Sequence, residues 1–188
     1  MKNVLIALAV IVVIALMVFG WYKGGYNMAV SKDEAVKSAW AQVENQLQRR
    51  NDLIPNLVNT VKGYADQEKG VFTEVTRLRS QWGEAKTIPE KIANADAMSS
   101  ALSRLLMVSE NYPQLKSNEN FLALQSQLEG TENRIAVERM RYNQTAQDLN
   151  TFRRELFGQF FANAAGVKEA AIYFKASEKA KEAPVVKF

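Results

Sequence analysis

The chain has 188 residues, with 24 basic and 20 acidic side chains, a formal net charge of +4, and neither cysteine nor histidine. This composition excludes disulfides and thiol chemistry, and it lacks the commonest general base and metal ligand. The charges are balanced and spread along the chain, which argues against nucleic-acid binding, because that function uses clustered basic residues.

The chain opens with an apolar run that continues without interruption over residues 4–19. A helix over residues 4–22, at a rise of about 1.5 Å per residue, crosses the ~30 Å hydrocarbon core of a bilayer. Aromatic residues follow the run where an interfacial belt is expected, with Lys23 beyond them. We therefore predict a single-pass membrane anchor within residues 1–25, formed by Val4, Leu5, Ile6, Leu8, Ile11, Ile14, Leu16, Phe19, Trp21 and Tyr22.

Three other interpretations of this run are weaker. A cleaved signal peptide needs small residues at its cleavage site, whereas residues 17–22 are mostly bulky. A lipid-modified cysteine is excluded because the chain has none. A buried helix of a soluble protein would rarely be this long without a polar residue. Lysines flank both ends of the run, so the side of the membrane on which the remaining chain lies stays open.

Residues 26–188 are expected to form one helical domain. The pattern Ser-x-x-Glu at residues 31–34 is a capping box and predicts the start of a long amphipathic helix that continues to Trp82. Pro55 removes one helical hydrogen bond, so we expect a kink or short break at residues 51–55. Gly63 and Gly70 are expected to weaken this helix without ending it.

The remaining elements follow from turn and cap signals. A loop at residues 83–89 precedes a second helix over 89–111, which Pro113 stops. A third helix is expected over 118–157 with Ser117 as its cap. A bend at 158–166 and a short helix over 167–183 complete the chain. The predicted fold class is all-α, with an N-terminal transmembrane helix followed by a long antiparallel four-helix-bundle-like body that resembles a coiled coil. Four aromatic residues occur at core spacing: Trp40, Tyr64, Trp82 and Tyr142.

Several motifs resemble the LemA family. They are distributed over essentially the whole chain: GYN at residues 25–27, QLQRR at 46–50, NDLIPNLV at 51–58, VKGY at 61–64, ENYP at 110–113, NFLALQ at 120–125, EGTENRIA at 129–136, YN at 142–143, YF at 173–174, and APVVKF at 183–188. The resemblance implies an N-terminal membrane anchor and a four-helix-bundle-like body, and it leads us to expect a bacterial cell membrane as the location. Many family members carry a lipid-attachment cysteine near the end of the leader, and this chain departs from that pattern.

One polar cluster lies at the expected kink: Arg49, Arg50, Asn51 and Asp52. An interrupted helix exposes amide groups beside arginine, so this cluster could bind a phosphate or an anionic headgroup. Alternatively, its polar groups pair with a neighbouring helix at Glu132, Asn133 and Arg134 and set the register of the bundle. The pairing interpretation is favoured.

No catalytic set is recognisable. Glu129 and Glu132 are neighbours on one predicted helix, and a carboxylate-bridged metal site of a bundle normally also uses histidine. The sequence has no glycine-rich phosphate loop, no nucleophilic triad and no zinc-ligand spacing. We expect neither an enzyme nor a bound cofactor or metal.

The leading functional hypothesis is a membrane-anchored scaffold that acts by interaction and assembly. Its expected partners are membrane lipid, further copies of the chain in a homo-oligomer, and another membrane protein, with a role in membrane organisation or remodelling. The alternative is a sensory or ligand-binding module that recognises an anionic lipid headgroup or metabolite at residues 49–52.

Overall fold

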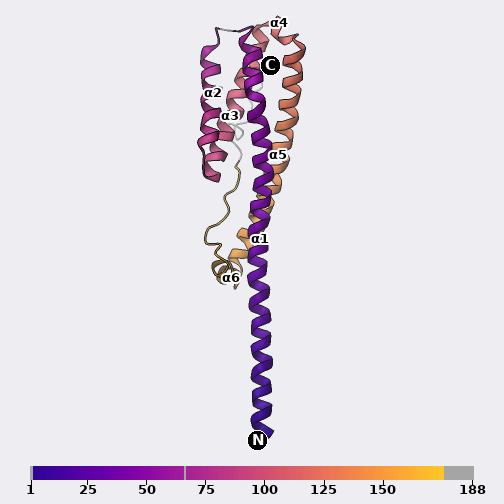
Figure 1. Cartoon of the computed structure of the whole chain (residues 1–188), viewed down its shortest axis with the longest axis vertical. Coiled ribbons are helices and arrows are strands. Elements are labelled where there is room, and N and C mark those ends of the chain that lie inside the picture. The colour runs from indigo at the N-terminus through magenta and orange to yellow at the C-terminus, as the bar shows by residue number, and fades with distance from the viewer. Residues whose placement is uncertain (1, 66, 176–188) are drawn as a thin grey trace, which may run out of the picture. The chain divides into compact units, whose positions relative to one another are not determined.

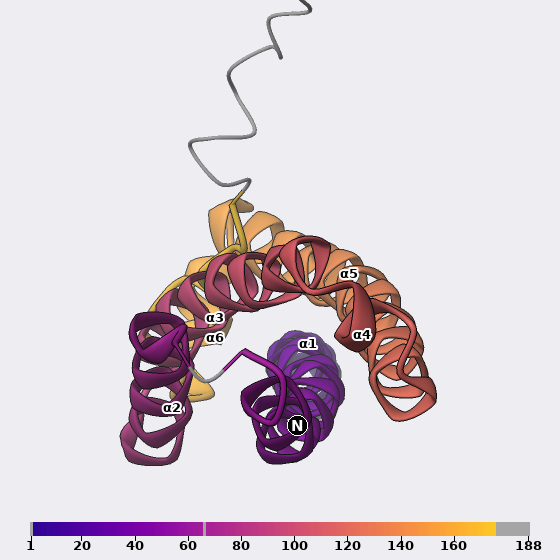
Figure 2. The same cartoon turned by 90° about the horizontal axis from the view of Figure 1, so that it is seen from above.

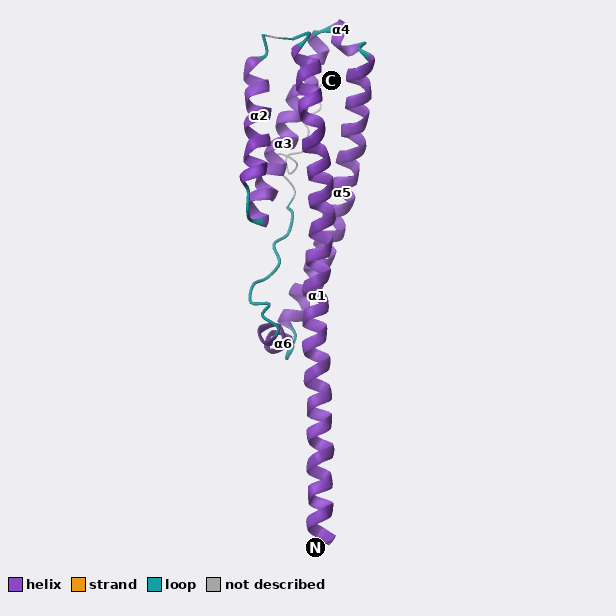
Figure 3. Cartoon of the chain, in the orientation of Figure 1, coloured by secondary structure: helices purple, strands orange, loops and turns teal. Residues whose placement is uncertain are grey.

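The computed structural model describes residues 2–65 and 67–175, and every regular element in these residues is helical (Figure 3). The all-α class is therefore confirmed. The elements are α1 (Lys2–Lys62), α2 (Lys69–Glu84), α3 (Ile88–Val108), the 3-10 turn η1 (Ser109–Asn111), α4 (Pro113–Lys116), α5 (Glu119–Arg154) and α6 (Gly158–Ala164).

These elements fall into two compact units. Among the described residues, the bundle unit comprises 42–140 with 174 and 175, and the terminal unit comprises 2–41 with 141–173. Helices α1 and α5 each contribute one part to each unit.

In the bundle unit, α1, α2, α3 and α5 run side by side, and successive helices point in opposite directions (Figure 1). Seen from above, α2, α3 and α5 form a curved row around α1 (Figure 2). Apolar side chains from all of these helices and from α4 meet in one core. The four-helix-bundle-like body is confirmed, with the following residues buried at its centre: Ile54, Leu57, Val61, Phe72, Val75, Leu78, Met98, Leu102, Leu105, Leu115, Phe121 and Leu128.

The predicted long helix over residues 31–82 is wrong, because it is divided into α1 and α2. The division begins at Gly63, which follows the last residue of α1, and the amides of Tyr64 and Ala65 both bond to the carbonyl of Val61. The apolar spacing is helical on both sides of the turn, because α1 and α2 face the same core. That spacing indicates which face is buried but does not show where the chain reverses.

The helix start expected at residue 31 is also wrong, since α1 is continuous through it. Of the kink or short break expected at 51–55, the break is wrong, because these residues are helical throughout. Asp33 and Glu34 instead hold the ammonium group of Lys37, at 2.7 and 2.8 Å. Pro55 lies inside α1. It costs the helix one hydrogen bond, whereas Ile54 and Leu57 on either side of it are fully buried in the core.

The later boundaries agree more closely with the sequence. Thr87 caps α3 in a capping box with Glu90, and Pro89 lies in the first turn, as expected from its missing donor. Tyr112 separates η1 from the next helix, and Pro113 is the first residue of that helix, α4. Asn118, rather than Ser117, caps α5, because its side-chain oxygen accepts a hydrogen bond from the amide of Phe121 at 3.0 Å.

The end of the chain differs from the prediction. The expected bend at residues 158–166 contains helix α6. The helix expected over 167–183 is wrong for residues 167–175, which are not helical, and the rest of that prediction lies outside the described residues. Among the aromatic residues placed at core positions, Trp40, Trp82 and Tyr142 are buried, but Tyr64 is 41% exposed.

In the terminal unit, α6 packs against α1 through Phe161, whose ring lies against the backbone of Gly25. A Cβ atom at Gly25 would overlap that ring, whereas nothing lies within 4 Å of a Cβ at Gly24. Glycine is therefore required at position 25 for the close approach of the two segments.

This pair of neighbouring glycines gives a matched test. Gly24→Ala should leave α6 in place, because alanine only improves helix propensity there, by up to about 1 kcal/mol. Gly25→Ala makes the same change in propensity but displaces a buried phenylalanine, whose burial contributes about 1.5–3 kcal/mol. Amide hydrogen exchange of residues 158–164 in the detergent-solubilised full chain should therefore accelerate in Gly25→Ala only. Equal exchange in both variants would show that this contact does not hold α6.

Candidate functional site

The most unusual residue of the bundle is Arg50, whose side chain is only 1% exposed. Its position follows from helical spacing, because the buried residues of α1 recur at 43, 47, 50, 54, 57 and 61. Arginine therefore stands where the pattern calls for an apolar side chain. This spacing was visible in the sequence, and it is the signal by which the burial of Arg50 could have been predicted.

The guanidinium group of Arg50 joins three helices. Its Nη1 atom donates to the hydroxyl of Ser99 and to a carboxylate oxygen of Glu132, both at 2.8 Å. Its Nη2 atom donates to the backbone carbonyl of Ala95 at 3.1 Å. Helix α1 is thus tied to α3 and to α5 at one level of the bundle.

A second ion pair lies near the first. Nη1 of Arg139 on α5 is 3.0 Å from a carboxylate oxygen of Asp96 on α3, and the guanidinium of Arg139 lies 4.7 Å from the ring centre of Phe174. We call Arg50, Asp96, Ser99, Glu132 and Arg139 the polar layer. Burial lowers the pKa of Arg50, and the carboxylate of Glu132 opposes this effect. Because arginine keeps its proton in proteins, the buried charge has to be compensated by these acidic partners.

The structure separates the residues that the sequence grouped at positions 49–52. Arg50 and Asn51 are buried, whereas Arg49 and Asp52 are exposed. Asp52 accepts a hydrogen bond from Gln48 at 2.8 Å on the same helix.

The pairing interpretation is confirmed for Arg50 with Glu132, while Asn133 and Arg134 are exposed. The anion-site alternative loses its premise, since α1 is not interrupted and exposes no helix-end amides at residues 51–55.

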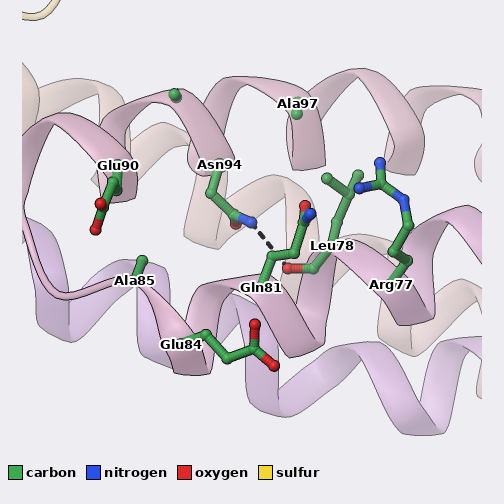
Figure 4. Close-up of a pocket in the computed structure, with 9 residues that line it drawn as sticks. Arg77, Leu78, Gln81, Glu84, Ala85, Glu90, Asn94 and Ala97 are labelled. Atoms are coloured by element: carbon green, nitrogen blue, oxygen red, sulfur yellow. Dashed lines mark hydrogen bonds between the residues drawn. The ribbon is translucent and has the colours of Figure 1, made fainter.

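Two hollows border this part of the bundle. One, of about 420 Å³, adjoins the polar layer between α3 and α5 and is lined by Ser99, Leu102, Ser103, Leu106, Leu128, Glu129, Glu132 and Asn133. The other, of about 500 Å³, lies between α2 and α3 (Figure 4).

Several polar groups that line these hollows have structural uses. In the second hollow, Asn94 donates to the carbonyl of Leu78 at 2.9 Å, and Glu90 accepts from the amides of Lys86 and Thr87. In the first hollow, Glu132 holds Arg50, and Glu129 accepts from Gln125 at 3.0 Å. No group of three or more acidic residues that could hold a metal ion occurs in the residues that the structure describes.

The predicted anchor residues lie on α1 and are exposed. Their side chains from Val4 to Phe19 are 49–69% exposed wherever they are large. Within the described part of the chain, α1 is the one helix that is long and apolar enough to cross a membrane, and its most apolar window has no buried residue. The interpretation of this run as a buried core helix is therefore wrong.

The polar layer can be tested by removing one charge. Glu132→Gln keeps the shape of the side chain but leaves the Arg50 guanidinium without its carboxylate. We expect a loss of about 1–2 kcal/mol in the free energy of unfolding, less than for a fully buried pair because Glu132 is 40% exposed.

The control is Glu129→Gln, one helical turn away on α5, which should change stability by no more than about 0.5 kcal/mol. Denaturant unfolding of the detergent-solubilised chain measures both variants. Two equal losses would mean that the contact with Arg50 contributes nothing specific.

Comparison with known proteins gives one family and a consistent set of relatives. The LemA family model matches residues 39–188. Magnetosome proteins MamQ 1 and MamQ 2 of Paramagnetospirillum magneticum are each 26% identical to the chain over 187 residues, covering 86% of it and 68% of the relative. Magnetosome protein MamQ of Magnetospirillum gryphiswaldense is 23% identical with the same coverage.

Proposed function

The chain belongs to the LemA family, and on that basis we propose that it is a single-pass membrane protein whose helical bundle is an interaction and assembly scaffold. The observation that carries the membrane part of this proposal is the exposed apolar run of α1, residues 4–19. Burial of an aliphatic side chain of this size gains about 1.5–3 kcal/mol. A run of aliphatic side chains that no other part of the described chain covers is therefore strongly stabilised when it enters lipid.

The scaffold part rests on how the polar groups of the bundle are used. The ion pairs of the polar layer, of which only Arg50 is fully buried, hold helices to one another, and paired charges of this kind set register between helices. In the hollow beside the polar layer, the hydroxyls of Ser99 and Ser103 donate to backbone carbonyls, and Glu132 holds Arg50. These uses support a role in helix contact rather than in turnover. We therefore propose a protein that is not an enzyme.

Self-association is the proposed mode of contact. The surfaces of α3 and α5 in the bundle unit carry exposed apolar side chains, at Met107, Leu122, Val137 and Met140. Copies held at one height by a membrane anchor meet more often than free copies, because tethering raises their effective concentration. A homo-oligomer is the first expected assembly, and another membrane protein is the second partner class.

The broader role follows from the names of the relatives. They are named magnetosome proteins, and we propose for this chain a part in membrane organisation or remodelling.

The anchor is tested by extraction of membranes with alkaline carbonate. The full chain should stay with the membrane pellet, whereas a Leu8→Arg, Ile11→Arg double variant should be released, since each arginine at mid-membrane costs about 2.5–3.5 kcal/mol. The control, Leu122→Arg, adds a charge at an exposed position of α5 and should stay in the pellet. Wild-type chain recovered in the soluble fraction would refute the anchor.

Assembly is tested by amine-reactive crosslinking in native membranes, followed by mass determination of the detergent-solubilised chain. We expect masses that are multiples of the 21.1 kDa chain. A monomeric mass alone, in membranes and in concentrated detergent solution, would contradict the homo-oligomer.

A further inference from the structure

We propose that the segment around α6 is a second membrane contact, in which Leu156, Phe157 and Phe160 enter the lipid interface beside α1. The inference rests on the proposed function, since it requires that α1 spans a bilayer. It assigns a lipid-binding surface to Leu156 and Phe157, which lie between α5 and α6, and to α6 itself, where the sequence predicted a bend.

Ring contacts place this segment along α1. The ring of Trp21 meets Phe157 at 5.3 Å and Phe161 at 4.8 Å between centres, both edge-on. Tyr22 meets Phe160 at 6.3 Å and Phe161 at 6.1 Å. The segment is therefore held at the level of these two aromatic residues of α1.

That level corresponds to the lipid interface. Trp21 follows the last residue of the apolar run, Phe19, by two positions, or about 3 Å along a helix axis. The polar headgroup region adds roughly 5–8 Å on each side of the hydrocarbon core, and tryptophan and tyrosine are enriched there. Side chains packed on Trp21 and Tyr22 thus lie where acyl chains meet headgroups.

The segment has one side that faces the protein and one that does not. Phe161 and Ala162 are buried, at 4% and 0% exposure. By contrast, Leu156 is 89% exposed, Phe157 52% and Phe160 54%, although both phenylalanines touch α1. This exposed apolar surface is continuous, through Trp21, with the exposed run of α1. The continuity argues for lipid as the occupant, because one bilayer covers both surfaces.

Basic side chains accompany the apolar ones. Arg153 and Arg154 lie in the last turn of α5, directly before this segment, and Arg153 donates to the carbonyl of Lys168. Glu155 is the acidic residue that shares a surface hollow with them. An apolar face with lysine and arginine at its border is the pattern of segments that lie in anionic membrane surfaces.

The test uses the absence of cysteine from the chain, which allows single-cysteine variants without further changes. Leu156→Cys carries a nitroxide label in the full chain, reconstituted in vesicles of phosphatidylcholine and phosphatidylglycerol. Position 156 tolerates the label because its side chain is almost fully exposed. Collision of the label with oxygen, which concentrates in lipid, is compared with collision with a nickel chelate, which stays in water.

Two reference variants calibrate the measurement. Leu8→Cys reports a position inside the proposed span, and Ser126→Cys reports an exposed position on α5 in the bundle unit. We expect the label at 8 to be deep, the label at 126 to be accessible to nickel, and the label at 156 to lie between them at the headgroup–acyl boundary. Phe160→Cys should give the same depth as 156.

Each other outcome overturns the inference in a distinguishable way. A label at 156 as accessible to nickel as that at 126, with a deep label at 8, would refute the second contact and leave the anchor intact. If the label at 156 is shielded from both reagents, and becomes accessible when the protein is diluted in the vesicles, a second copy of the chain covers the segment. A label at 8 in water would refute the anchor and the inference together.

Discussion

The structure depends first on the different surroundings that the two parts of α1 need. Its residues 4–19 are apolar on every face and exposed in the described chain. From Val36 onward only one face of the same helix is apolar, and that face is buried. A helix that is apolar all round needs a surrounding apolar medium, whereas a helix with one apolar face needs other helices on that face. One uninterrupted element thus carries two patterns made for two environments, which is the physical basis for anchor and bundle in one chain.

Within the bundle unit, the polar layer limits how the helices can be paired. An apolar stripe alone allows one helix to shift along its neighbour by one or more turns, because apolar side chains of similar size can replace one another in the contact. Arg50 removes that freedom, since its donors reach acceptors on α3 and α5 in one register only. Such a layer adds little net stability, because desolvation of the charges offsets much of their attraction. Its contribution is specificity of helix pairing, which agrees with the proposed scaffold role.

In the terminal unit, aromatic side chains join α6, which the family model includes, to a part of α1 that precedes the family model. The family model begins at residue 39 and includes α6, whereas Trp21, Tyr22 and Gly25 precede it. Phe161 nevertheless fills the space left by the missing Cβ of Gly25. Residues 21–25 of α1 are therefore complementary in shape to α6. This part of α1 makes specific contacts, in addition to continuing the apolar helix.

The sequence by itself determined the all-α class, the apolar run, the loop before Pro89 and the stop at Pro113, because each follows from composition or from one residue's backbone chemistry. Only the tertiary structure decided that α1 continues through Ser31 and Pro55, that the chain reverses after Lys62, that α6 forms, and that Arg50 also bonds to Ser99 and Ala95 on α3. A cap or a proline shifts local stability by about 1–3 kcal/mol, and burial of several core side chains outweighs it. Apolar periodicity shows which face of a helix is covered, but what covers it depends on contacts between residues far apart in the chain.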